Sequence, residues 1–84
     1  MNRSEVFTLI LEERARQAEL WQEPHAHGLG DCSSPHVPQM VKAVVLAEEA
    51  GEVARAVLDG KADALRAELV QVAAVAVAWL EGMP

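Results

Sequence analysis

The chain has 84 residues and a formal net charge of −6, and 51% of its residues are hydrophobic, many of them alanine or valine. This length allows one domain, 1–84, and the negative charge excludes nucleic acid polymers as partners because it repels phosphate backbones. A core built from such small side chains buries little area, so we expect a homo-oligomer, dimer or tetramer, to supply the missing burial.

The cysteine usage and the hydropathy pattern indicate the compartment. The single cysteine, Cys32, excludes an internal disulfide framework and is typical of a reducing environment. The N-terminal stretch MNRSEVFTLILEERARQ lacks the layout of a signal peptide, because acidic residues flank a very short apolar segment. The apolar run from Leu69 to Leu80 is too short to cross a bilayer. We therefore expect a cytoplasmic protein that does not span a membrane.

The first predicted element is a helix from about Ser4 to about Gln22. Ser4 is a suitable N-cap, and Glu5 follows in the first turn, where the helix dipole favours a carboxylate. Apolar and long side chains recur at three- and four-residue spacing up to Trp21, which is typical of an amphipathic helix. Pro24 ends the segment.

A loop from about residue 23 to 38, EPHAHGLGDCSSPHVP, follows this helix, because prolines and glycines recur throughout it. A loop of this length in so small a domain is either functional or disordered, and we favour a lid or a segment that contacts substrate. Four of its side chains leave a zinc site open as an alternative, although their spacing matches no standard finger: His25, His27, Cys32 and His36.

The second predicted helix runs from about Pro38 or Gln39 to Asp59, with Gly60 as its C-cap. Gly51 lies in the middle of this helix, where glycine costs about 1 kcal/mol relative to alanine. We therefore expect close packing of a neighbouring element against Gly51.

The third predicted helix runs from near Asp63, its expected N-cap, to near Gly82. The connection to the second helix is short, which predicts an antiparallel hairpin. Trp79 has apolar neighbours and is expected in the core or at an interface. The fold class is therefore all-α, a small hairpin or bundle of three main helices completed by oligomerisation.

Carboxylates interrupt apolar stripes of both hairpin helices. Glu49 and Glu52 are three residues apart, so they share a face of the second helix, and Glu48 lies beside them. Glu68 and Gln71 share a face of the third helix in the same way. The two pairs are about equally far from the turn, so an antiparallel hairpin places them at the same height.

Carboxylates gathered at one level among apolar residues repel each other and lose hydration, so they require a positive partner. Mg²⁺ prefers oxygen ligands and keeps water molecules for a phosphate group, while Lys42 is a second candidate partner. The competing interpretation is a solvated acidic face paired with nearby basic residues, and the matched height of Glu68 favours the cation site. A di-iron bundle would need a histidine three residues after a glutamate, and neither helix provides one.

With these motifs in place, the chain resembles the MazG-like nucleotide pyrophosphohydrolases of the all-α NTP pyrophosphatase superfamily. The pattern LAEEAGEV…AELVQVAAVAVAWLE is similar to the EExxE and ExxD motifs of that family, with a fitting spacer between them. EEAGE corresponds to residues 48–52, and the ERARQAELW stretch of the first helix is similar to the Arg-Gln-Trp pattern of the family. The resemblance covers nearly the whole chain apart from the loop.

The resemblance implies a helical bundle completed by dimerisation, and Mg²⁺-dependent hydrolysis of a nucleoside triphosphate to the monophosphate and pyrophosphate, with Mn²⁺ as an alternative cation. Carried over residue by residue, it implies Glu49, Glu52 and Glu68 as metal ligands. It implies Glu48 as a ligand to a second metal or as the catalytic base that orients the attacking water. Gln71 stands where the family has aspartate; its amide oxygen can bind a cation, but it carries no charge and cannot act as a base.

Three further residues are candidates for contact with the nucleotide. Trp21 is suited to stack on a base, with a core or interface position as the alternative. Lys42 lies just beyond the loop and is available to a phosphate, and Arg14 is available to the nucleotide or to a partner helix. The rival function is a non-catalytic helical oligomer of the same fold, nucleotide-binding or structural, and the presence of Gln71 is the feature that favours it.

Overall fold

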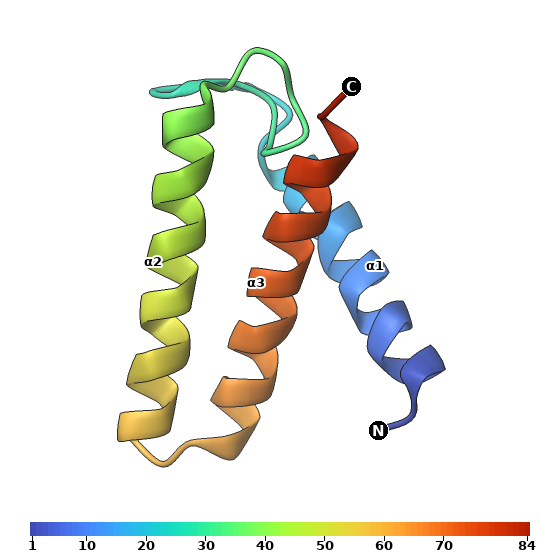
Figure 1. The fold of residues 1–84 in the computed structure, drawn as a ribbon, viewed down its shortest axis with the longest axis vertical. Coiled ribbons are helices and arrows are strands. Elements are labelled where there is room, and N and C mark those ends of the chain that lie inside the picture. The colour runs from blue at the N-terminus through green and yellow to red at the C-terminus, as the bar shows by residue number, and fades with distance from the viewer.

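The computed structural model describes residues 1–84 as three helices, with a short strand pair between the first and the second (Figure 1). The helices are α1 (Arg3–Leu20), α2 (Gln39–Leu58) and α3 (Ala62–Glu81), and the strands are β1 (Pro24–His25) and β2 (Gly28–Leu29). The mostly helical content fits the predicted all-α class. No helix is both long enough and apolar enough to cross a membrane.

The N-cap residue of α1 is not the one that the sequence predicted. Asn2, not Ser4, is the N-cap: its Oδ1 accepts a hydrogen bond of 2.9 Å from the backbone N–H of Glu5. The Glu5 carboxylate accepts in return from the backbone N–H of Asn2, which completes a capping box. The prediction of Ser4 as the N-cap was wrong. The pairing of Asn2 with Glu5, the third helical residue, satisfies two backbone donors, the N–H groups of Asn2 and Glu5. A cap at Ser4 would leave one of them free.

A tight turn joins α2 to α3 and produces the predicted antiparallel hairpin (Figure 1). Gly60 lies one residue beyond the C-cap Asp59 and has a φ of +65°. Its N–H bonds the carbonyl of Val57, and the N–H of Lys61 bonds the carbonyl of Ala56, which is the Schellman arrangement. The left-handed φ explains why glycine stands here, although the C-cap itself is Asp59 and not Gly60 as predicted.

The N-terminus of α3 also corrects the prediction. Lys61 occupies the N-cap position without a side-chain cap, and Asp63 lies inside the first turn. Asp63 therefore favours the helix through its charge near the positive end of the helix dipole and not through capping.

The helix α3 lies between α1 and α2 and packs against both of them (Figure 1). The buried apolar residues are few and mostly small: Ile10, Val37, Ala56, Ala74, Val75 and Ala78. No large side chain is fully buried. Trp79 is half-buried and joins the end of α3 to the start of α2, because its Nε1–H donates a hydrogen bond of 2.6 Å to Gln39 Oε1. The single chain therefore has a thin core, as its composition predicts.

The loop between α1 and α2 is folded against the end of α3, which makes the disordered alternative wrong. β1 and β2 pair as antiparallel strands, a feature that the helical spacing of the sequence did not indicate. Asp31 accepts hydrogen bonds from the backbone N–H and the hydroxyl of Ser33. The Ser33 carbonyl would lie 2.5 Å from any Cβ added at Gly82, so the loop touches the α3 backbone directly.

The expectation for Gly51 is wrong within a single chain. Gly51 is exposed, and a Cβ added there would meet no atom within 4 Å. No element of the same chain packs against this side of α2.

Candidate functional site

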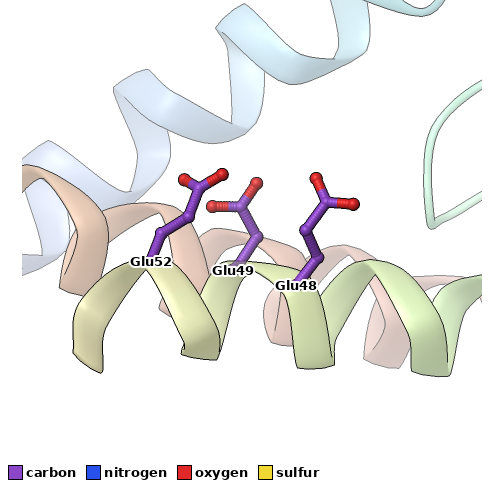
Figure 2. Close-up of side chains that lie close together, drawn as sticks. All are labelled: Glu48, Glu49 and Glu52. Atoms are coloured by element: carbon purple, nitrogen blue, oxygen red, sulfur yellow. The ribbon is translucent and has the colours of Figure 1, made fainter. Parts of the chain in front are cut away.

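Three carboxylates of α2 form the centre of the candidate site. Ligand oxygens of Glu48, Glu49 and Glu52 all lie within 4.8 Å of one another. Figure 2 shows the three side chains projecting to the same side of α2. The helical period contributes to this, since Glu52 follows Glu49 by three residues and Glu48 by four, and positions at these spacings are neighbours on a helix surface. Glu49 is half-buried, while Glu48 and Glu52 are exposed at the edge.

The helix α3 places a fourth carboxylate, Glu68, beside this group, although Glu68 is not among the residues whose oxygens lie within 4.8 Å of one another. The pKa of Glu68 is raised above its ordinary value of 4.5, first by loss of hydration and then by the Glu52 carboxyl group, which hydrogen-bonds it and repels its charge. These interactions require the two side chains to meet across the hairpin. The matched heights inferred from the sequence therefore describe the actual packing of Glu52 and Glu68.

Burial and mutual repulsion dominate the electrostatics of the site. The pKa of Glu49 is also raised, first by burial and then by the charges of the neighbouring glutamates, with Glu52 ahead of Glu68 and Glu48. One carboxylate oxygen of Glu49 and one of Glu68, Oε2 in each case, are buried without any hydrogen-bond partner. Buried oxygens of this kind carry a desolvation cost that no group of the chain offsets, and a positively charged ligand would offset it.

Basic side chains form no ion pair with this group, although Arg16 lies near enough that the charge of Glu49, after the hydrogen bonds and charge of Glu13, raises its pKa. The ion pairs of the molecule join Arg14 to Asp31 and Glu81, Arg16 to Glu13, and Arg55 to Asp59. None of them includes Glu48, Glu49, Glu52 or Glu68, and Lys42 makes no ion pair with any of these four residues. The interpretation as a salt-bridged acidic face is thereby weakened. A hard divalent cation fits the remaining donors, which are all carboxylate oxygens.

Sequence reasoning missed a fifth acidic residue, Glu13 of α1. Its charge is among the causes that raise the pKa values of Glu49 and Glu68, so it faces the same space. Glu13 itself is held by a bidentate ion pair with Arg16, 2.7 Å at both contacts, and by a 3.0 Å hydrogen bond from Gln17. The hydrogen bonds from Arg16 lower the pKa of Glu13, so it stays charged.

The signal that could have found Glu13 is its spacing. Arg16 and Gln17 follow it by three and four residues, which places all three side chains on one face of α1. Figure 2 shows α1 running past the carboxylates of α2.

Gln71 lies one turn after Glu68 and faces α1. It is half-buried and lines a cavity of about 560 Å³ together with Glu13 and Arg16. The amide is not part of the compact group of oxygens formed by the α2 glutamates. Its predicted role as a metal ligand stays a prediction.

The residues suggested for nucleotide contact differ in their exposure and in the groups that they contact. Arg14 is mostly buried and is held by Asp31 at 2.8 Å and by Glu81 at 2.6 Å, so its guanidinium clamps the loop to the end of α3. Trp21 is 45% exposed and packs edge-on against His25. Their roles in substrate binding stay predictions.

Lys42 is the only buried charged residue, with 4% of its surface exposed. It points into the molecule near Cys32, whose thiol pKa is raised by burial and by Asp31 against the opposing charges of Lys42 and Arg14. Nothing in the chain forms a salt bridge with Lys42, and its contact with a phosphate stays a prediction.

The histidines and the cysteine of the loop do not come together. The only group of three or more potential metal-ligating side chains is the glutamate group of α2. Both ring nitrogens of His25 are engaged, Nε2 with the Gly30 carbonyl at 2.8 Å and Nδ1 with the backbone N–H of His27 at 3.2 Å. The zinc alternative for this loop therefore has no assembled site.

Comparison of the chain with models of protein families, with curated proteins and with solved structures finds no match in any of the three. The interpretation of the site therefore depends on its own geometry and chemistry.

Proposed function

We propose that this chain is a Mg²⁺-dependent nucleoside triphosphate pyrophosphohydrolase of the MazG-like type, acting as a cytoplasmic homo-oligomer. The reaction releases a nucleoside monophosphate and pyrophosphate. One observation carries the proposal: carboxylates of α2 and α3 converge while buried oxygens of Glu49 and Glu68 lack any partner. Such a group of hard oxygen donors suits a cation that also binds phosphate.

Each carboxylate has a distinct part in this proposal. Glu49, Glu52 and Glu68 would hold Mg²⁺, or Mn²⁺ in its place. When bound, the cation neutralises the charge of the phosphates at the reacting phosphorus. Glu48 is exposed at the edge of the group, where it orients the attacking water and accepts its proton. Lys42, with its unpaired charge, would attract the triphosphate. Trp21 and Arg14 are the further proposed contacts to the nucleotide.

The decisive experiment is an assay of pyrophosphate release from canonical and modified nucleoside triphosphates, each with Mg²⁺ and with Mn²⁺. We expect turnover of at least one triphosphate, abolished in Glu52→Ala together with cation binding. Glu48→Gln should lose turnover but keep most of the cation affinity, because it removes the base and leaves the three proposed ligands. Absence of turnover with every triphosphate and both cations would reject the enzymatic function.

The rival is a non-catalytic helical oligomer of the same fold, and Gln71 is the residue that favours it. The amide supplies no charge to the cation and lies in the cavity between α1 and α3. The same assay separates the two, because a binding module retains cation and nucleotide in equilibrium dialysis and releases no pyrophosphate.

A further inference from the structure

The cavity of about 560 Å³ between α1 and α3 lies beside the carboxylates of the candidate site. Glu13 lines this cavity, and its charge also acts on the site: burial and then the neighbouring charges, that of Glu13 included, raise the pKa values of Glu49 and Glu68. Gln71, three residues after Glu68 on α3, lines the cavity as well. The volume is that of a pocket for a small molecule.

The lining of this cavity is polar and of mixed charge. Its polar side chains come from both helices: Glu12, Glu13, Arg16, Asp63, Arg66 and Gln71. Three carboxylates and two guanidinium groups give the lining a formal net charge of −1. Such a lining repels a polyphosphate chain and suits a neutral ligand that both donates and accepts hydrogen bonds.

Three of the charged side chains in the lining are free to bind a ligand. Arg16 and Glu13 satisfy each other through two hydrogen bonds of 2.7 Å. Arg66, Glu12 and Asp63 take part in none of the ion pairs of the chain. The cavity therefore offers the planar donor fork of one arginine and the acceptor oxygens of two carboxylates.

A nucleoside fits these groups, and guanine fits them better than the other bases. Guanine carries two adjacent acceptors, O6 and N7, which an arginine binds through two parallel hydrogen bonds. Its N1–H and its amino group at C2 are donors on the neighbouring edge, where a carboxylate can accept both of them. Adenine places a donor beside N7 and has no amino group at C2, so it would use only part of this lining. The ribose hydroxyls suit the remaining carboxylate.

The order of the groups along the hairpin gives the substrate a direction. Asp63 and Arg66 lie on the side of Glu68 that is nearer to the turn. Lys42 lies about two helical turns beyond Glu49, on the side away from the turn. A nucleotide with its base at Arg66 and its reacting phosphate at the carboxylates therefore directs its remaining phosphates towards Lys42.

We propose that the cavity between α1 and α3 binds the nucleoside part of the substrate, and that Arg66 selects guanine there. Glu12 and Asp63 accept hydrogen bonds from the base and from the ribose. This inference rests on the proposed function, because it places the phosphates at the carboxylates that would hold the cation. The substrate class is then a guanine nucleoside triphosphate.

Binding of the α,β-methylene analogues of GTP, ATP, CTP and UTP tests the inference without turnover, because the bond that the proposed reaction breaks cannot be hydrolysed in them. Isothermal titration calorimetry with Mg²⁺ should show that the GTP analogue binds at least about fivefold more tightly than the other three. Arg66→Gln should remove this preference and leave the Mg²⁺ affinity unchanged. The matched control is Arg3→Gln, which removes an exposed arginine of α1 outside the cavity and should keep the preference.

A second variant tests the location of the pocket independently of the base. Ala67 is exposed and lines the cavity, so Ala67→Phe fills the space without entering the core. We expect the affinity for all four analogues to fall at least about tenfold, while the Mg²⁺ affinity stays unchanged.

Equal affinities of the wild type for the four analogues would overturn the inference, as would unchanged affinities in Ala67→Phe. A guanine preference that Trp21→Ala loses and Arg66→Gln retains would place the base at the end of α1 and would overturn it too. The pyrophosphate assay separates this inference from the proposed function. Guanine-selective binding without pyrophosphate release supports the pocket and rejects the hydrolase, whereas equal turnover of GTP, ATP, CTP and UTP supports the hydrolase and rejects the selection of guanine.

Discussion

The carboxylate of Glu52 on α2 lies against the carboxylate of Glu68 on α3 across the hairpin, and the pKa of Glu68 is raised, first by loss of hydration and then by Glu52. Sixteen positions separate them in the sequence, and the Gly60 turn brings them to one height. Two like charges in contact destabilise the fold, and this supports the proposed cation site. The predictions below follow from this arrangement and from the clamp at the other end of the molecule.

Replacing Glu49 with glutamine should weaken Mg²⁺ and Mn²⁺ binding at least about tenfold, because it removes a charge from the half-buried centre of the group. Isothermal titration calorimetry measures this change. Glu19→Gln is the matched control, since it removes an equal charge from an exposed position of α1 outside the group and should leave the affinity unchanged. Equal affinities in the wild type and in Glu49→Gln would place the cation elsewhere.

The pH dependence of stability has a definite sign. Folded Glu49 and Glu68 both have pKa values above the ordinary 4.5, so folding favours their protonated forms. Their contribution to stability is complete below about pH 4.5 and is lost as the pH rises through the raised pKa values. We expect Glu49→Gln/Glu68→Gln to be more stable than the wild type at pH 7 without metal, because it removes two charges whose ionised forms folding disfavours.

That difference should vanish as the pH falls towards 4, and saturating Mg²⁺ should reverse it at pH 7, because only the wild type binds the cation. Urea unfolding of both proteins over this pH range, with and without Mg²⁺, tests the prediction. A difference between the two proteins that does not depend on pH would contradict it.

Gln71→Asp tests whether the uncharged amide of Gln71 limits the cation affinity and the activity of the site. An aspartate one turn after Glu68 adds a negative charge on the side that faces Glu13 and Arg16. We expect tighter Mg²⁺ binding, by about three- to tenfold, and faster pyrophosphate release. Gln71→Asn keeps the amide chemistry in a side chain of the size of aspartate and serves as the control. Identical cation affinities for the two variants would mean that position 71 does not reach the cation.

Arg14→Ala should destabilise the protein by roughly 2 kcal/mol, because it releases Asp31 and Glu81 and leaves the Asp31 carboxylate mostly buried without its partner. Chemical denaturation measures this loss. Asp31→Asn opens the loop side of the same clamp and keeps the arginine, so it should lose a similar amount.

Comparison of these two variants also tests the proposed contact of Arg14 with nucleotide. If Arg14 contacts the nucleotide, the KM for nucleoside triphosphate should rise more in Arg14→Ala than in Asp31→Asn. Equal KM values would restrict Arg14 to the clamp between the loop and α3.

The predictable part of the fold came from local rules. Helical spacing located all three helices, and the position of Gly60 indicated the turn that makes the hairpin antiparallel. Counting residues away from this turn then places Glu49, Glu52 and Glu68 at the same height along the hairpin. Cap residues were less predictable, because Ser4 and Asp63 are good caps by type, while the competing bonds of Asn2 and the backbone geometry at Lys61 decided the outcome.

The sequence by itself determined an acidic, mostly helical chain with carboxylates on two facing helices. Only the tertiary structure decided that Glu13 of α1 joins them and that Arg14 is committed to Asp31 and Glu81. The physical reason is that these relationships depend on the angle and rotation at which α1 crosses α3. Packing of small side chains sets both quantities, and no periodicity within a single helix encodes them.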